Sequence, residues 1–320
     1  MTSEDALTTL DDLPDAGRIR SRRLVGGIVT IVADATGLGA RDRDALEARL
    51  KAAALAVPGA SEARVALTAS RPQRRLVAIG SGKGGVGKST LTANLAIALT
   101  RMGKKVGVID ADIYGPSQPT LFGTSEKPRA EKEKLIPVEV KGVKLLSVGQ
   151  LVPPGQALAW RGPMATSALN QLVEGDWGDT DLILVDLPPG TGDVQLSLIQ
   201  KARPAGAVIV STPQDLSLID ATRAIDLFGK TNVPVLGLVE NMAGYQCPHC
   251  GESSDPFGQG GAEASADRLG VPFLGRLPLS TSLREASDAG TPPAGEDGPA
   301  ADAFEAIARQ LLLELEKVGG

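Results

Sequence analysis

The stretch LVAIGSGKGGVGKST, residues 76–90, decides the fold of this 320-residue chain. The pattern G-x-x-x-x-G-K-[ST] is satisfied by Gly82, Gly87, Lys88 and Ser89. An apolar, strand-like run precedes the motif and a helix-like run follows it. Glycines permit positive φ angles and a close backbone approach, so amide N–H groups can line a phosphate. The helix N-terminus adds partial positive charge. The stretch predicts a nucleotide-binding P-loop, and the alternative is a glycine-rich turn between strand and helix.

The expected ligands of this loop are ATP and Mg²⁺. Lys88 is expected to reach the β- and γ-phosphates, and the Ser89 hydroxyl is expected to ligate Mg²⁺. A P-loop does not require a second lysine, so Lys83 on its own could be an ordinary surface lysine. The residues of this segment that we expect to contact the nucleotide are Gly82, Lys83, Gly84, Gly85, Val86, Gly87, Lys88, Ser89 and Thr90.

Carboxylates follow two further strand-like runs. Asp186 ends LILVD and precedes the switch-like segment LPPGTGD (187–193), which suits a residue that holds Mg²⁺ through water. The alternative is an ordinary helix cap or turn residue. The run VGVID leads into Asp110 and Asp112, one of which could orient an attacking water, because the chain's single histidine lies elsewhere. A carboxylate that caps the next short helix is the alternative there.

Short β-branched strands alternate with helices through residues 76–320 and predict an α/β fold. Continuous apolar strands are buried on both faces, which favours a mostly parallel sheet flanked by helices. The charged stretch 124–134 predicts a solvated, mobile surface loop. The candidate strands are LVAIGS, VGVIDAD, KLLSV, DLILVDL, GAVIVST and PVLGLVEN.

Residues 1–70 predict a separate small α+β domain, joined to the larger one by a polar linker at 71–75. LVGGIVTIVAD is expected to be one strand, RDRDALEARLKAAALAV a helix that ends at Pro58-Gly59, and ARVALTA a second strand. The buried face of the helix is expected to carry Leu46, Leu50, Ala53, Ala54 and Val57.

Composition and charge exclude several classes of protein. Apolar residues make up 42% of the chain, which indicates globular packing, whereas aromatics make up only 3% and the net charge is −5. A nucleic-acid binder needs a basic field and stacking side chains, so we expect no nucleic-acid partner. The N-terminus resembles no secretory signal, and no apolar run approaches the ~18 residues of a membrane span. We therefore expect a cytoplasmic protein with no membrane partner.

The only two cysteines, Cys247 and Cys250, flank the only histidine, His249, in the sequence CPHC within a long glycine-rich loop (244–262). A thioredoxin-like redox pair is disfavoured because the following GESSDPFGQGG cannot form a regular helix. A disulfide this short would be strained. As a metal site the tetrapeptide is incomplete, since zinc and iron–sulfur clusters usually need about four ligands. Two copies related by a two-fold axis would supply four cysteines for a [4Fe–4S] cluster or for zinc.

The motif GKGGVGKST resembles the deviant P-loop of the MinD/ParA/nitrogenase-iron-protein class. Five further blocks look like the Mrp-type iron–sulfur cluster carriers, so that the resemblance covers nearly all of residues 76–292. CPHC, in its position, is the most specific of these motifs. The blocks are DADIYGPSQPTLFG (110–123), DLPPGTGDVQLSL (186–198), STPQDLSLIDATRAIDLF (211–228), ENMAGYQCPHCG (240–251) and GVPFLGRLPLSTSLREASDAGTP (270–292).

The resemblance implies specific roles. Lys83 would reach across a homodimer to the partner's phosphates and, with Lys88, assist catalysis. Asp112 would activate water, and Asn241 would recognise the adenine base. Cys247 and Cys250 would bind a [4Fe–4S] cluster shared across the dimer and passed from a donor to apo-proteins.

The N-terminal residues are similar to a small domain that precedes many Mrp ATPases and is associated with iron–sulfur assembly. Relatives often carry a cysteine before its helix, but DATGLGARDRD (34–44) has none, so we expect a structural or interaction role.

Two other functions fit parts of the sequence. A MinD- or ParA-like positioning ATPase would work on a membrane or on DNA. MinD-like proteins end in a basic amphipathic membrane helix, yet residues 301–320 hold four acidic and two basic side chains. We expect the apolar stripe there to pack on the domain instead. A metallochaperone GTPase for zinc or nickel would carry N-K-x-D, which the stretch ENMA (240–243) does not match. The stripe comprises Phe304, Ile307, Leu311 and Leu315.

Overall fold

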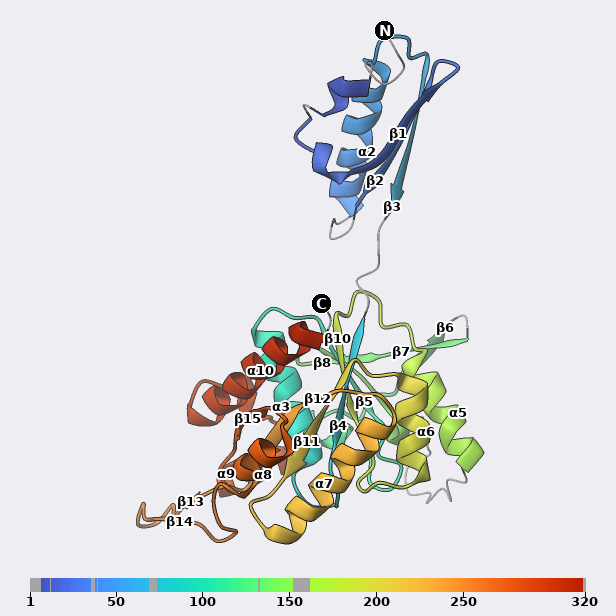
Figure 1. The fold of residues 1–320 in the computed structure, drawn as a ribbon. Coiled ribbons are helices and arrows are strands. Elements are labelled where there is room, and N and C mark those ends of the chain that lie inside the picture. The colour runs from blue at the N-terminus through green and yellow to red at the C-terminus, as the bar shows by residue number, and fades with distance from the viewer. Residues whose placement is uncertain are drawn as a thin grey trace. The chain divides into compact units, whose positions relative to one another are not determined.

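The chain divides into two compact units, Met1–Gln73 and Arg74–Gly320. The division falls inside the stretch expected to be a linker. Both units are drawn in Figure 1. The computed structural model describes residues 7–11, 13–35, 38, 40–68, 74–131, 133–151 and 162–318.

The smaller unit is a three-stranded sheet covered on one face by a helix (Figure 1). Its strand order is β1-β2-β3, with β1 antiparallel and β3 parallel to the central β2. The helix buries Leu46, Leu50 and Ala54 against the sheet, as its periodicity predicted, while Ala53 is only half-buried. The helix ends at Leu55, earlier than expected, and Val57 is buried just beyond its end. The elements are η1 (Thr8–Leu10), η2 (Ala16–Arg18), β1 (Ile19–Val25), β2 (Ile28–Asp34), α2 (Ala40–Leu55) and β3 (Glu62–Thr68).

One expectation about this unit is wrong. LVGGIVTIVAD is not a single strand, because Gly26 and Gly27 adopt φ angles of +56° and +77° and join β1 to β2 in a hairpin. Two-residue turns that match the twist of paired strands need positive φ, which glycine adopts without a Cβ clash. A Gly-Gly pair between two apolar runs is therefore a hairpin signal, and it adds a strand on the N-terminal side.

The larger unit is built on an eight-stranded sheet of order β15-β12-β11-β4-β10-β5-β9-β8. All neighbouring strands are parallel except the edge pair β8 and β9. The expected α/β class is confirmed. The strands are β4 (Arg75–Gly80), β5 (Val106–Asp110), β8 (Val138–Val140), β9 (Val143–Ser147), β10 (Leu182–Asp186), β11 (Gly206–Ser211), β12 (Val235–Glu240) and β15 (Phe273–Arg276).

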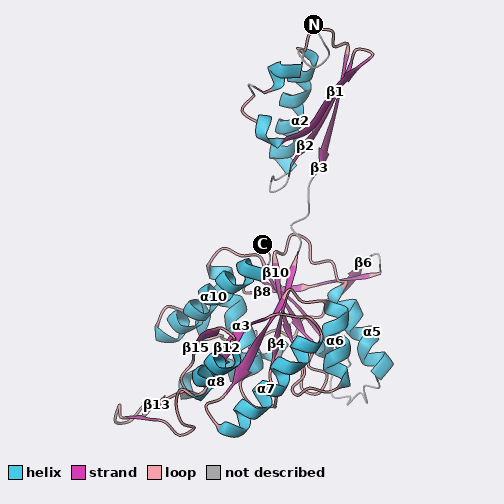
Figure 2. Ribbon diagram, viewed as in Figure 1, coloured by secondary structure: helices cyan, strands magenta, loops and turns pink. Residues whose placement is uncertain are grey.

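Helices cover both faces of this sheet (Figure 2). One face packs against α3 (Lys88–Arg101) and α10 (Pro299–Val318). Connecting elements are α4 (Gln118–Leu121), α9 (Thr281–Asp288), η3 (Val148–Leu151) and η4 (Pro293–Gly295). The other face packs against α5 (Gly162–Val173), α6 (Asp193–Ala202), α7 (Asp215–Lys230) and α8 (Gly261–Leu269).

Strand β10 shows why these strands are apolar throughout. Leu182 and Leu184 belong to the core on the α3 side, whereas Ile183 belongs to the core on the opposite side. Successive side chains of a strand point to opposite faces, so a strand with helices on both sides needs an apolar residue at every position.

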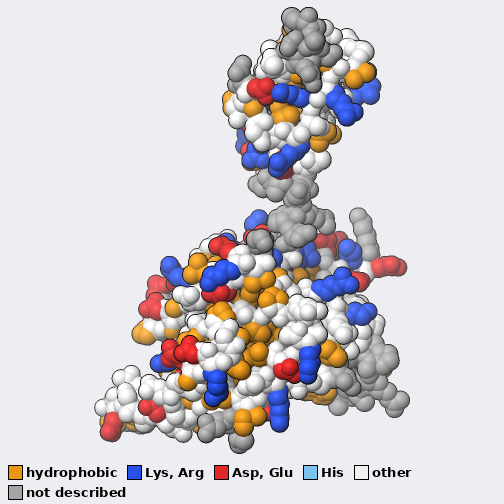
Figure 3. Space-filling model, viewed as in Figure 1, with side chains coloured by type: hydrophobic (Ala, Val, Ile, Leu, Met, Phe, Trp, Pro, Cys, Tyr) orange, Lys and Arg blue, Asp and Glu red, His pale blue; other side chains and the backbone are white. Residues whose placement is uncertain are grey.

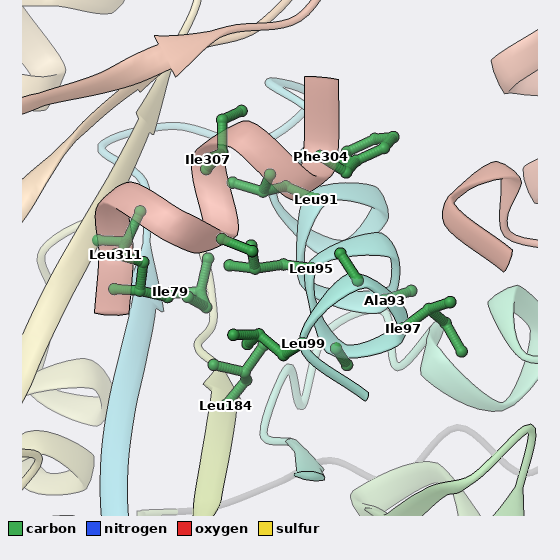
Figure 4. Packing of buried hydrophobic residues seen from close by; sticks show 14 of the residues in the cluster. Ile79, Leu91, Ala93, Leu95, Ile97, Leu99, Leu184, Phe304, Ile307 and Leu311 are labelled. Carbon is green, nitrogen blue, oxygen red and sulfur yellow. The ribbon is translucent and has the colours of Figure 1, made fainter. Parts of the chain in front are cut away.

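The C-terminal stripe packs on the domain as expected. In Figure 4, Phe304, Ile307 and Leu311 of α10 lie against the leucine face of α3. Leu315 completes the stripe and is 4% exposed. The apolar side of this helix is thus part of the core.

Two short hairpins stand outside the main sheet. Most of the described residues in the stretch 124–134 are exposed, as expected, but the stretch contains β6 (Arg129–Glu131), which pairs with β7 (Lys134–Ile136). The second hairpin pairs β13 (Tyr245–Gln246) with β14 (Ser253–Ser254) and carries CPHC in its turn.

On the face shown in Figure 3, basic and acidic side chains of the larger unit are interspersed. Within the described ranges, every helix is too short or too polar to span a bilayer.

The packing of α10 on α3 predicts a difference between two substitutions in one helix. Phe304→Ala removes a fully buried ring and should lower the free energy of unfolding by about 3–5 kcal/mol. Leu313→Ala removes a side chain that is 52% exposed and should cost less than about 1 kcal/mol. Urea unfolding followed by circular dichroism measures both. Equal losses would contradict this packing.

Candidate functional site

The P-loop and the strand-end carboxylates meet at one edge of the large sheet, whereas the cysteines lie in the β13–β14 turn. Asp186, Asp110 and Glu240 are the last residues of β10, β5 and β12, and the P-loop follows β4. Parallel strands place their carboxyl ends at the same edge, which is where α/β folds bind ligands. Strand order therefore gathers residues that are more than a hundred positions apart in the chain.

The P-loop has the backbone that its glycines were expected to provide. Gly85 and Gly87 adopt φ angles of +80° and +83°, and α3 begins directly afterwards at Lys88. A Cβ on Gly87 would lie 2.0 Å from Asn241 Nδ2. That amide donates a hydrogen bond of 2.8 Å to the Val86 carbonyl. Asn241 is thus part of the P-loop's immediate surroundings.

The start of the loop is held by two other elements. A Cβ on Gly82 would lie 2.1 Å from the backbone oxygen of Asp220, so α7 packs against this point of the loop. Ser81 Oγ donates to the Lys83 carbonyl (2.9 Å), and Gly190 N donates to the Ser81 carbonyl (3.0 Å). The loop is therefore tied to the segment 187–192. The Lys83 side chain is half-buried, and among the described residues its ammonium has no hydrogen-bond or ion-pair partner.

Lys88 is a buried cation at the centre of the site. Its Nζ lies 2.5 Å from Asp186 Oδ1, 3.2 Å from Ser89 Oγ and 3.7 Å from Asp112 Oδ2. Both carboxylates therefore compensate the buried charge. Ser89 and Asp186, the two residues expected near Mg²⁺, converge on one ammonium. A phosphate bound to the loop would compete with Asp186 for it.

Gln118 is a site residue that the sequence did not reveal. Its Nε2 donates to Asp186 Oδ2 (2.7 Å) and to the Ser89 carbonyl (3.0 Å), and its backbone N donates to Asp110 Oδ2 (3.1 Å). The side chain is fully buried. The sequence signal that could have indicated this role is the position of Gln118, shortly after the strand-end carboxylates and in the first turn of α4.

Asp110 and Asp112 have different surroundings. Complete burial raises the pKa of Asp110 to about 7, with a further contribution from the charge of Asp186, although donors from Ser147, Gln118 and Asp112 oppose the shift. Asp112 Oδ1 accepts bonds from the Tyr114 and Gly115 amides (3.1 and 3.3 Å).

Asp112 thus stabilises the turn after β5 with one oxygen, while the other faces Lys88. The residue therefore serves the local turn and also lies within the site.

A pocket of about 410 Å³ adjoins the P-loop. Gly87 and Thr90 line one side, Asn241 and Tyr245 another, and the segment 278–284 a third. Its volume is in the range of small-ligand sites. It can accommodate a nucleoside whose phosphates lie in the loop.

CPHC forms the turn between β13 and β14. Cys247 is half-buried, Cys250 is exposed, and both thiols are free. The turn is closed by bonds from Cys247 N to the Glu252 carbonyl (2.9 Å) and from Gly251 N to the Cys247 carbonyl (2.8 Å). The backbone amides of Cys250 and His249, together with the Cys250 thiol, interact with Cys247 and lower the pKa of its thiol.

The described part of the chain contains no group of three or more His, Cys, Asp or Glu side chains placed to hold a metal ion. Each chain therefore offers two cysteines here, and backbone donors support the Cys247 thiol.

These features define a P-loop nucleotide-binding protein with a mostly parallel sheet flanked by helices. Comparison with known proteins specifies the class further. Residues 73–312 match the family described as ParA: NUBPL iron-transfer P-loop NTPase. The chain belongs to this family.

The iron–sulfur cluster carrier protein of Deinococcus radiodurans is 43% identical over 314 residues, which are 94% of this chain and 89% of that protein. The mitochondrial iron–sulfur protein required for NADH dehydrogenase from Arabidopsis thaliana is 51% identical over 68% of this chain and 70% of its own length.

Solved structures of nucleotide-binding proteins share this fold. The nucleotide-binding protein from Archaeoglobus fulgidus in complex with ADP is 41% identical, with a TM-score of 0.63, and the match covers 72% of this chain and 91% of that one. The septum site-determining protein MinD from Pyrococcus horikoshii, complexed with Mg-ADP, has 25% identity and a TM-score of 0.57, over 78% and 98% of the two chains. The expected resemblance to Mrp-type carriers within the MinD/ParA class is confirmed.

The burial of Asp110 predicts a pH dependence of stability. Its pKa is raised from 3.8 to about 7 in the folded chain, so the folded state holds this proton more tightly than the unfolded state. The stabilisation is complete below about pH 4 and is lost as the pH rises through about 7. Asp110→Asn should remove this contribution and flatten the fall in unfolding free energy across that window. Urea titrations of nucleotide-free protein at several pH values measure the slope, and identical slopes for both proteins would refute the assignment.

Proposed function

We propose that this protein is an ATP-hydrolysing carrier that holds a [4Fe–4S] cluster between two subunits and transfers it to apo-proteins. The observation that carries the proposal is the pair of free cysteines, one half-buried and one exposed, in the β13–β14 turn of a chain whose family is described as iron-transfer P-loop NTPases. Support for the nucleotide, the dimer and the cargo comes from different residues.

The nucleotide half of the proposal rests on the P-loop and its neighbours. The glycine backbone leaves amides free to face phosphates, and Lys88 supplies a buried positive charge. Asn241 borders the 410 Å³ pocket, in which it would contact the adenine base. Ser89 would ligate Mg²⁺ and Asp186 would hold it through water. The bound ion would neutralise charge on the phosphates.

Asp112 is suited to orient the attacking water. Its Oδ1 is fixed by two backbone amides, and its Oδ2 faces Lys88 Nζ at 3.7 Å. An oriented carboxylate near the phosphate-binding cation can hold a water for in-line attack without a histidine.

Lys83 supports a dimer. It lies in the P-loop but, within the described ranges, its ammonium meets no carboxylate. In the proposed dimer it would stabilise charge on the partner's phosphates, as an arginine finger does. A site that needs this lysine in trans is complete only when two chains meet.

The cargo half rests on the cysteine turn. Lowering of the Cys247 thiol pKa favours the thiolate, the form that binds iron. Two turns across a two-fold axis would supply the four thiolates that a [4Fe–4S] cluster requires. A cluster held on short hairpins at a subunit boundary would be accessible to acceptors. The relatives named as cluster carriers support this cargo over zinc.

Reconstitution tests the cargo. Wild-type protein incubated anaerobically with iron and sulfide should gain brown charge-transfer absorbance and about four iron per dimer. Cys247→Ala and Cys250→Ala should each retain less than about a tenth of that absorbance, because a shared site loses two ligands at once. His249→Ala changes the residue between them and should behave as wild type. Retention of the cluster by both cysteine variants, or uptake of zinc but not iron, would disprove the bridging cluster.

Mixing of variants tests the dimer. Lys83→Ala and Lys88→Ala should each reduce ATP hydrolysis by at least about tenfold. A 1:1 mixture should recover roughly a quarter of the wild-type rate, because half of random dimers contain one intact composite site out of two.

Lys104→Ala, at an exposed lysine after α3, is the control and should hydrolyse ATP normally. Failure of the mixture to exceed the sum of its components would place Lys83 in its own subunit's site.

A further inference from the structure

Glu240 is a fully buried carboxylate with no role in the function proposed above. It is 0% exposed and is the last residue of β12. The residue after it is Asn241, which contacts the P-loop, and the cysteine turn follows six positions further on. Glu240 therefore lies between the nucleotide site and residues 241–260, which contain both cysteines and are called the cysteine segment below.

The carboxylate holds the far end of the cysteine segment. Oε1 accepts a hydrogen bond from Gly260 N (3.2 Å), and Oε2 accepts one from Ala262 N (2.7 Å). These amides belong to the N-terminus of α8, where a negative charge is favoured. Arg276 Nε lies 3.7 Å from Oε1. A segment of about twenty residues that contains both cysteines is thus closed at its base by one side chain.

The near end of the segment is fixed at the same place. Ala243 N donates to the Leu277 carbonyl (2.9 Å), and Leu279 N donates to the Gly244 carbonyl (2.8 Å). Leu277 N in turn donates to the Glu240 carbonyl (2.8 Å). Both arms of the cysteine segment are therefore anchored to the end of β12 and to the residues that follow β15.

The residues that follow β15 form a wall between two pockets. The 410 Å³ pocket lies beside the P-loop, and a second pocket of about 460 Å³ is lined by Cys247, Gln246 and Pro248. The residues that line both pockets are Pro278, Leu279, Ser280, Thr281 and Leu283. A nucleoside in the first pocket would contact one side of this wall, and Cys247 lines the pocket on the opposite side of the wall.

We infer that Glu240 is a positioning residue that clamps the cysteine segment against this wall, so that nucleotide binding alters the accessibility of Cys247 within one chain. A ligand that packs on Tyr245 and Leu279 stabilises the clamped arrangement and reduces the local opening that exposes the half-buried thiol. The inference rests on the nucleotide site of the proposed function, but it requires neither the cluster nor the dimer.

Alkylation of the thiols tests the inference on the full-length, metal-free, reduced protein. Limiting N-ethylmaleimide is added with and without saturating Mg-ADP, and mass spectrometry gives separate rates for Cys247 and the exposed reference Cys250. In the wild type, Mg-ADP should slow alkylation of Cys247 by at least about threefold. In Glu240→Gln, one hydrogen-bond acceptor becomes a donor that faces an amide. Cys247 should then react faster, and the effect of Mg-ADP should disappear, while ADP affinity stays within about threefold.

Matched variants separate the clamp made by Glu240 from a general effect of charge near Arg276. Glu263→Gln removes the other carboxylate that pairs with Arg276 but leaves the α8 amide bonds intact, so it should keep the wild-type protection. If Glu240→Gln melts below the assay temperature, Glu240→Asp keeps the charge, withdraws the carboxylate by one methylene and should show reduced protection.

Two results would overturn the inference. One is a rate of Cys247 alkylation in the wild type that Mg-ADP does not change, and the other is full protection of Cys247 by Mg-ADP in the Glu240 variants. Neither result depends on whether a cluster forms, and loss of ADP binding itself would appear separately in the affinity measurement.

Discussion

The buried charge of Lys88 constrains the architecture of the larger unit. A buried ammonium without partners costs several kcal/mol, so the fold must supply carboxylates at its position. Asp186 does so from β10, in register with Ile79 of β4 and with Asp110 of β5. A shift of one residue in either pairing would turn these side chains to the other face of the sheet. The phosphate site and the register of the central strands therefore depend on each other.

The same constraint concentrates negative charge. Asp186 lies beside Asp110, and the one ammonium is shared with Asp112, so Asp110 relies on neutral donors from Gln118 and Ser147. Burial and, to a lesser degree, the charge of Asp186 raise the pKa of Asp110. Binding of a phosphate and a divalent cation would redistribute these charges, which gives the site an electrostatic reason to respond to its ligand.

The fold and the phosphate site could be predicted because both depend on local pattern. Alternating strands and helices, with apolar residues at every strand position, require a parallel sheet covered on both faces. The motif around Lys88 then places the ligand edge. Strand β1 was missed because three of its seven residues are arginines, and because its last two residues, Leu24 and Val25, run on through Gly26–Gly27 into the apolar residues of β2. Strand β15 is only four residues long and contains Gly275, so it lacks a periodic signal.

The remaining parts of the site depend on contacts between distant segments. In the sequence, nothing distinguishes Gln118 from other polar residues, because its partner Asp186 lies on β10, far along the chain. Glu240 resembles many strand-end carboxylates, and its partners lie some twenty residues later in a glycine-rich stretch. The wall at 278–283 lies between two pockets only after β15 has joined the sheet edge. Local pattern carries no information about such pairings.

The packing of α10 on α3 has a consequence for synthesis of the chain. Helix α3 begins at the P-loop, yet part of its apolar face is covered by residues 299–318. On the ribosome, that surface stays uncovered until some two hundred further residues have been translated, whereas the N-terminal unit can close its own core much earlier. The nascent nucleotide-binding unit thus exposes an apolar helix face for a long interval, during which chaperones would bind it.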